Sequence, residues 1–87
     1  MATRANILIV DDDKDQLDLF GLLLEKAKFK AFKALSVDEA MQILECEKVD
    51  CVVLDVFMPT TSGQVFTQYL RAHDALQDIP IIMLTAG

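Results

Sequence analysis

The chain has 87 residues, which is enough for one small domain and too few for two. Its composition, 53% hydrophobic and 25% charged, is typical of a globular protein and argues against disorder. The net charge of −6, with eight lysines and arginines in all, argues against direct binding to nucleic acid and favours a divalent cation or a basic protein surface as partner. No apolar run approaches the ~18 residues that span a bilayer.

Only four apolar residues, 7–10, follow the polar start of the chain before three aspartates, which is not the pattern of a secretory signal. We therefore expect a cytoplasmic protein without a membrane segment. Cys46 and Cys51 fit no C-x-x-C pattern, so we expect buried or half-buried free thiols rather than a metal site or a disulfide framework.

Short apolar runs alternate with amphipathic segments along the chain. The runs with the composition of strands are residues 6–10, 30–35, 51–54 and 81–84. The segments with apolar residues at helical spacing are 14–28, 37–47, and a third that follows a cap at Thr61 or Ser62. This βαβαβαβ order predicts a doubly wound parallel sheet with helices on both faces.

Capping residues mark where the first two helices begin. Asp13 with Gln16, and Ser36 with Glu39, have the spacing of capping boxes. Gly21 lies inside the first predicted helix, where it costs about 1 kcal/mol relative to alanine. Lysines 30 and 33 suit an edge strand, because charge discourages further strand pairing.

Polar residues follow three of the four predicted strands. Residues 11–13 are all aspartate, Asp55 ends the third strand, and Thr85 follows the fourth. In a parallel sheet, sites form beyond the carboxyl ends of the strands, so these groups point to one place. Carboxylates held close together repel one another, and Mg²⁺ with a few protein oxygens and several waters relieves that repulsion. The alternative is that the three aspartates only cap the first helix, but Asp13 alone satisfies that role.

Asp55 is the most informative of these residues, because a carboxylate at the end of a fully apolar strand is costly without a partner. Carboxylates can act as nucleophiles and form acyl phosphates. Thr85 could donate a hydrogen bond to a phosphoryl oxygen there, although threonine is also an ordinary residue at a strand end.

Three segments of the chain resemble the receiver domain of two-component response regulators. Residues 7–13 look like the family's first strand and acidic pair, residues 54–63 carry its D-x-x-M-P-x-x-x-G loop, and residues 79–86 look like its fourth strand and switch hydroxyl. The resemblance covers almost the whole chain. It implies a flavodoxin-like receiver fold with strand order 2-1-3-4.

The resemblance also implies a role for each candidate site residue. Asp55 would be the phosphoacceptor, and Thr85 would hydrogen-bond the phosphoryl group. Asp12 and Asp55 would bind Mg²⁺ directly, Asp11 would bind it through water, and the backbone carbonyl of Phe57 would complete the protein ligands. The partner would be a sensor histidine kinase or a phosphotransfer protein. The chain itself would be a signalling domain rather than an enzyme, with at most self-phosphorylation and autodephosphorylation.

Members of that family continue through a helix, a strand and a helix, and that strand bears a lysine and an aromatic switch residue. The sequence at hand ends at Gly87 and contains neither. We therefore expect residues 1–87 to be an incomplete receiver domain, and residues 81–84 to form an uncharged edge strand through which copies associate.

Other interpretations are possible for the acidic motif. Asp11 and Asp13 resemble the Asp-x-Asp pair of haloacid-dehalogenase-like hydrolases, but Asp15 stands where that pattern has threonine or valine. A calcium loop of EF-hand type that starts at the same place would have Gln16 for its glycine and Leu22 for its closing glutamate. The stronger alternative is a phosphorylation-silent receiver-like scaffold or interaction module, since function belongs to sites rather than to folds.

Overall fold

The computed structural model describes residues 5–55, 63–73 and 76–84, and it describes only the backbone of residues 55, 63–67 and 84. Seven elements follow one another along the chain. They are β1 (Asn6–Val10), α1 (Lys14–Lys26), β2 (Lys30–Ala34), α2 (Val37–Cys46), β3 (Cys51–Asp55), α3 (Gly63–Ala72) and β4 (Ile81–Leu84). The predicted βαβαβαβ order is confirmed, and no boundary between the described elements moves by more than two residues.

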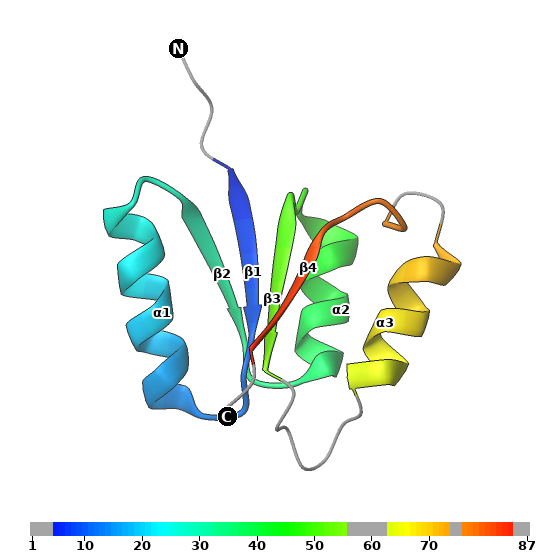
Figure 1. Cartoon of the computed structure of the whole chain (residues 1–87), viewed down its shortest axis with the longest axis horizontal. Coiled ribbons are helices and arrows are strands. Elements are labelled where there is room, and N and C mark those ends of the chain that lie inside the picture. Colours follow the sequence, from blue (N-terminus) through cyan, green and yellow to red (C-terminus); the bar gives the residue numbers. More distant parts are fainter. Residues whose placement is uncertain (1–4, 56–62, 74–75, 85–87) are drawn as a thin grey trace.

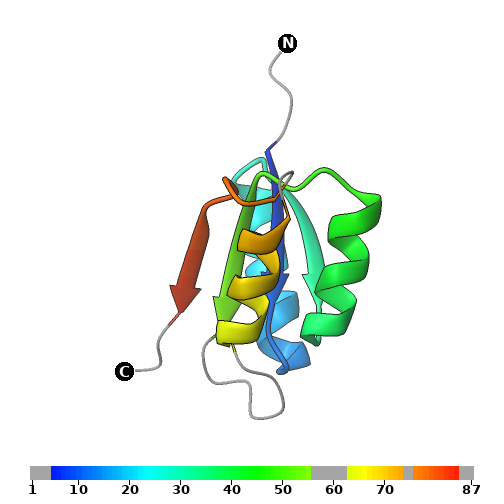
Figure 2. The ribbon, with the colours of Figure 1, turned by 90° about the vertical axis from the view of Figure 1, so that its right-hand side faces the viewer.

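The four strands form one parallel sheet in the order β2-β1-β3-β4. Helix α1 covers one face of this sheet, and helices α2 and α3 cover the other (Figure 1). Both the doubly wound architecture and the strand order 2-1-3-4 are therefore confirmed. The lysine-containing strand β2 lies at one edge, as predicted, and Figure 2 shows β4 as the outermost strand on the other side.

Strand alternation divides the apolar core into two clusters. Leu8 and Val10 of β1 and Val52 and Leu54 of β3 are buried on the face covered by α2 and α3, together with Leu70 of α3. The cluster on the α1 side is smaller. Its buried members are Ile7, Ile9 and Leu17. The continuous apolar run of β1 is thus explained, because this strand is buried on both sides of the sheet. In β3, Val52 and Leu54 are buried on the α2–α3 side, whereas Cys51 and Val53 are half-buried against the cluster on the α1 side.

Helix α1 begins where the sequence predicted and ends two residues earlier. Asp13 is its N-cap, and the Asp13 Oδ1 atom accepts hydrogen bonds from the backbone N–H groups of Asp15 at 3.0 Å and Gln16 at 3.3 Å. Lys28 adopts a left-handed conformation with φ 74°, and the Phe29 N–H donates to the Leu24 carbonyl at 2.9 Å. These features form a Schellman motif that ends the helix, with lysine at the position where glycine is usual.

Helix α2 has the predicted N-cap, but its capping box differs from the expected one. Ser36 Oγ accepts a hydrogen bond from the Glu39 N–H at 3.2 Å. The Glu39 carboxylate accepts from the N–H of Leu35 at 2.9 Å, rather than from that of Ser36. The helix ends at Cys46, one residue before the predicted end. The proposed caps of α3, Thr61 and Ser62, lie outside the described residues.

Two further expectations concern the thiols and membrane insertion. Both cysteines are free thiols, as predicted, and Cys51 is half-buried. The predicted burial is wrong for Cys46, which is exposed at the last residue of α2. Within the described residues, no helix has the length and apolar character needed to cross a bilayer.

Candidate functional site

The candidate site lies where β1 and β3 end side by side. In the parallel register Val10 is the partner of Leu54, so Asp11 and Asp55 are the next residues along two neighbouring strands. The arrowheads of both strands point to the same edge of the sheet, the lower one in Figure 1. The topology therefore brings the first aspartate of the acidic motif and the end of β3 together, as the strand-end argument predicted.

Asp11 is held inside the protein by its own turn. Its side chain is only 1% exposed, and it is the one buried charged side chain among those that the structure describes. The Asp11 N–H donates to the carbonyl of Ala34 at 3.1 Å, and the Asp11 Oδ1 atom accepts from the N–H of Asp13 at 2.9 Å. The contact with β2 thus holds the Asp11 backbone, and the N-cap residue of α1 holds one oxygen of its carboxylate.

The other two aspartates of the motif are exposed and have different roles. Asp13 caps α1, so its Oδ1 atom is already engaged by two backbone N–H groups. The Asp12 carboxylate makes no hydrogen bond or ion pair to any residue that the structure describes. The prediction that Asp13 alone suffices as the cap is therefore confirmed, and Asp12 remains available as an oxygen ligand.

Three of the predicted site groups fall where the structure gives no side chain. The side chain of Asp55 and the whole of Phe57 and Thr85 lie outside the described residues, so their roles stay predictions. Leu84, which precedes Thr85, is the register partner of Asp55, so the chain leaves β4 beside the end of β3. Among the described side chains, no three His, Cys, Asp or Glu residues group closely enough to hold a metal.

The donor set near the strand ends suits Mg²⁺ rather than a softer metal. Asp11 and Asp12 supply carboxylate oxygens from one strand end, and Asp55 follows Leu54 on the neighbouring strand. Mg²⁺ prefers a few hard oxygen ligands and keeps several waters, whereas Zn²⁺ and copper favour nitrogen and sulfur. The residues present therefore fit the ion that the resemblance implied.

Lys14 is the positively charged residue nearest in sequence to the acidic motif, and it pairs with Asp18. Lys14, the first residue of α1, pairs through its Nζ atom with Asp18 Oδ2 at 3.0 Å, and Lys33 Nζ pairs with Asp18 Oδ1 at 3.1 Å. The hydrogen bond from Lys14, followed by that from Lys33, lowers the pKa of the Asp18 carboxyl below its ordinary value. The same contact with Asp18 raises the pKa of Lys14. These two lysines therefore balance the charge of Asp18.

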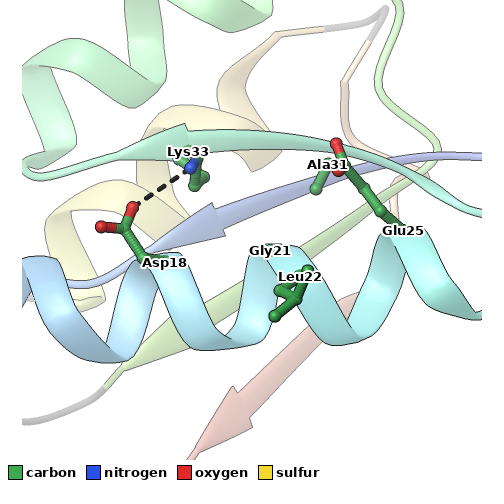
Figure 3. A pocket seen from close by; sticks show the side chains of 6 residues that line it. All are labelled: Asp18, Gly21, Leu22, Glu25, Ala31 and Lys33. Atoms are coloured by element: carbon green, nitrogen blue, oxygen red, sulfur yellow. Dashed lines mark hydrogen bonds and ion pairs between the residues drawn. The ribbon is translucent and has the colours of Figure 1, made fainter.

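Sequence reasoning missed a groove of about 300 Å³ between α1 and β2 (Figure 3). It is lined by Asp18, Gly21, Leu22, Glu25, Ala31 and Lys33. A Cβ atom at position 21 would lie 3.0 Å from Cδ of Lys33, so Gly21 lets the lysine stem cross the helix and reach Asp18. The only signal in the sequence was a glycine inside a helix that precedes a lysine-bearing edge strand.

Two known regulatory proteins are similar to this chain along most of its length. The chain is 37% identical over 79 residues to the regulatory protein VanR of Enterococcus faecium, covering 91% of this chain and 33% of that protein. It is 40% identical over 84 residues to the transcriptional regulatory protein YvrH of Bacillus subtilis, covering 95% of this chain and 34% of that protein. The chain thus spans about a third of the length of these curated relatives.

Two solved structures of response regulators have folds similar to that of this chain. The chemotaxis response regulator CheY4 of Vibrio cholerae superposes with a TM-score of 0.91 at 28% identity, over 98% of this chain and 71% of that one. The N-terminal domain of a response regulator receiver protein from Methanoculleus marisnigri gives 0.90 at 32% identity, over 98% and 69%. The family described as the response regulator receiver domain matches residues 7–87, and this chain belongs to that family.

Proposed function

We propose that this chain is the phosphoacceptor module of a two-component phosphorelay and that Asp55 takes the phosphoryl group. The observation that carries the proposal is the pairing of Val10 with Leu54, which sets the acidic motif beside the residue that ends β3. Membership of the receiver family supports the same reading.

The reaction is a phosphoryl transfer between two protein groups or from a small acyl phosphate. A carboxylate oxygen of Asp55 forms a bond to phosphorus while the bond from phosphorus to the donor breaks. With a phosphohistidine donor, the leaving imidazole nitrogen takes up a proton from solvent; with acetyl phosphate, acetate leaves. The product is an aspartyl phosphate, and its hydrolysis by water returns the free carboxylate.

The described residues supply orientation and charge for this chemistry. The buried Asp11 carboxylate is fixed by the Asp13 N–H, while the exposed Asp12 carboxylate is free to bind a cation. In this proposal Asp11, Asp12, Asp55 and the Phe57 carbonyl hold Mg²⁺. When bound, the ion would offset the negative charge of the transferring group and of the neighbouring carboxylates.

The remaining parts of the proposal concern Thr85 and the partner. Thr85 would donate a hydrogen bond to a phosphoryl oxygen, which the position of Leu84 beside Asp55 supports. The donor would be a sensor histidine kinase or a phosphotransfer protein in the cytoplasm. The chain would then act as a signalling domain, with no chemistry beyond its own phosphorylation and dephosphorylation.

Intact-mass measurement after incubation with acetyl phosphate tests the proposal. We expect the mass of one phosphoryl group to be added only when Mg²⁺ is present, and not in Asp55→Asn. Asp78→Asn is the matched control, because Asp78 is exposed in the segment before β4, at the amino end of that strand. Uptake that persists in Asp55→Asn would overturn the assignment, and no uptake by the folded chain would favour a silent interaction module.

A further inference from the structure

The turn from β2 into α2 lies at the carboxyl edge of the sheet, beside the candidate site. Strand β2 ends at Ala34, which is the register partner of Val10, and Asp11 follows Val10 directly. Helix α2 begins at Val37, at the same edge of the sheet (Figure 1). The turn therefore borders the backbone of the first aspartate of the acidic motif.

One peptide group in this turn makes a hydrogen bond in each direction. Its C=O belongs to Ala34 and accepts from the Asp11 N–H at 3.1 Å. Its N–H belongs to Leu35 and donates to the Glu39 Oε1 atom at 2.9 Å. A peptide group is planar, so its C=O and its N–H cannot turn independently. This unit, which we call the 34–35 peptide, thus joins the Glu39 carboxylate rigidly to the Asp11 backbone.

The Glu39 carboxylate takes the place of a neighbouring strand. Because β2 is an edge strand, its backbone groups point alternately to β1 and away from the sheet. The 34–35 peptide points its C=O to β1 and its N–H to the open side, where the sheet that the structure describes has no further strand. A carboxylate makes a stronger hydrogen bond to a backbone N–H than a neutral oxygen does. All of these groups belong to residues 11–39, on the other side of the sheet from β4.

The Glu39 side chain is not needed for the N-cap of α2. In a capping box, it would accept from the N–H of the N-cap residue, Ser36. The Ser36 Oγ atom accepts from the backbone N–H of Glu39 at 3.2 Å, a bond that does not involve the Glu39 side chain. The cap and the contact with the 34–35 peptide can therefore be removed separately, by substitutions at positions 36 and 39.

We propose that Glu39 is a positioning residue for Asp11 in the magnesium site, an inference that rests on the proposed function. Glu39 acts through the 34–35 peptide, which holds the backbone where β1 ends, and the Asp13 N–H then holds the Asp11 Oδ1 atom. A ligand that is ordered in advance loses less freedom when the cation binds, so binding is tighter. The charged acceptor also polarises the peptide group, which strengthens the hydrogen bond that its C=O accepts from Asp11.

Amide hydrogen exchange, measured by NMR without Mg²⁺ or a phosphoryl donor, tests the contact itself. In Glu39→Ala the Leu35 N–H loses its acceptor. We expect exchange of the Asp11 amide to rise at least about threefold relative to that of Leu8, in the middle of the same strand. Ser36→Ala removes the α2 cap but keeps the Glu39 carboxylate, so it should not raise this ratio. A general loss of stability raises the Leu8 rate as well, and the ratio therefore reports the local change.

Titration with Mg²⁺ tests whether the contact serves the metal site. We expect Glu39→Ala to weaken Mg²⁺ binding roughly two- to tenfold, the range that corresponds to the loss of one hydrogen bond. Glu39→Gln removes the same charge but keeps an oxygen acceptor for the Leu35 N–H, so it should restore most of the affinity. Asp38→Asn removes a charge from an exposed residue in the same turn of α2 and should leave the affinity close to that of the unsubstituted chain.

Two results would overturn the role of Glu39. One is a ratio of Asp11 to Leu8 exchange that Glu39→Ala leaves unchanged. The other is equal Mg²⁺ affinity in Glu39→Ala and Glu39→Gln, because the hydrogen bond to the 34–35 peptide would then contribute nothing to the metal site.

Failure of the proposed function gives a different result. A folded, unsubstituted chain that binds no Mg²⁺ would overturn the magnesium site itself, and this inference with it. The exchange ratios are measured without metal, so they keep that failure distinct from a failure of the Glu39 contact. None of these readouts depends on phosphorylation of Asp55.

Discussion

Val10 of β1 and Leu54 of β3 are partners in the parallel register, and the residue after each of them is an aspartate. This single pairing converts a sequence separation of more than forty residues into one candidate site at the carboxyl edge of the sheet. The Asp11 side chain is already fixed by the Asp13 N–H, so one carboxylate is oriented before any cation or phosphoryl group arrives.

The first prediction concerns magnesium. Asp12→Ala should remove Mg²⁺ binding, which we expect to have roughly millimolar affinity because few protein ligands contribute. The helical content should stay the same, since the exposed Asp12 side chain bonds to no described residue. Titration with Mg²⁺ followed by NMR measures both the binding and the helical content. Asp15→Ala is the control, because Asp15 is an exposed acidic residue in the first turn of α1. An unchanged titration in Asp12→Ala would exclude Asp12 as a ligand.

The second prediction concerns the end of α1. Lys28 has φ 74°, a conformation that costs a residue with a side chain roughly 1–2 kcal/mol. Lys28→Gly should therefore raise the free energy of unfolding by about 0.5–1 kcal/mol, because the greater freedom of glycine in the unfolded chain offsets part of the gain. Urea denaturation measures the change. Lys28→Ala keeps the strained conformation and should show no such gain; equal stabilisation by both substitutions would rule out the backbone explanation.

The third prediction concerns Gly21. Alanine at this position gains about 1 kcal/mol in helix propensity. Its Cβ atom would lie 3.0 Å from Cδ of Lys33, but that side chain is flexible and the exposed pair with Asp18 is worth at most about 1 kcal/mol. Gly21→Ala should therefore stabilise the chain by a few tenths of a kcal/mol, and by close to ~1 kcal/mol in a Lys33→Ala background. Destabilisation in both backgrounds would mean that another contact excludes the methyl group.

The fourth prediction concerns pH. Hydrogen bonds from Lys14 and Lys33 lower the pKa of Asp18 in the folded chain. Its ionised form therefore contributes stability above the ordinary carboxyl pKa of about 3.9, and this contribution is lost as pH falls through the lowered pKa. The raised pKa of Lys14 affects stability in the opposite direction of pH. The charged form of Lys14 contributes stability that is lost as pH rises through its raised pKa.

Asp18→Asn should remove both effects, leaving a smaller loss of stability in acid than in the unsubstituted chain. Thermal unfolding across the acid range at low salt measures this difference. Because the groups are exposed, the difference should shrink at high salt. An identical acid profile in both proteins at low salt would show that the ion pairs contribute nothing.

Patterns along the chain predicted the fold well, for reasons visible in the core. The run that became β1 is buried on both faces, and the run that became β3 is buried on one face and half-buried on the other, so their uninterrupted apolar composition predicted central strands correctly. The end of α1 was wrong because the Schellman motif uses lysine in place of glycine, and no compositional rule favours lysine there. The capping box of α2 differed because the Glu39 side chain contacts Leu35, a detail of local geometry.

The position of the candidate site could be predicted from the sequence, but the burial of its individual side chains could not. The strand-end rule brought Asp11 and Asp55 together from sequence alone, and the register agrees. The role of Asp13 as the cap could be predicted, but the sequence pattern could not show which of Asp11 and Asp12 is buried, because that depends on the turn that buries Asp11 and exposes Asp12. The groove at Gly21 was missed because it arises from contact between two elements.

Borohydride trapping identifies which residue carries the phosphoryl group, and we expect that residue to be Asp55. Reduction of an aspartyl phosphate converts that residue to homoserine, which peptide mass spectrometry locates in the sequence. After incubation with acetyl phosphate and Mg²⁺, we expect homoserine at position 55 alone, and none when a chelator removes the metal. Homoserine at Asp11, Asp12 or Asp13, or no trapped residue in a folded chain with bound Mg²⁺, would contradict it.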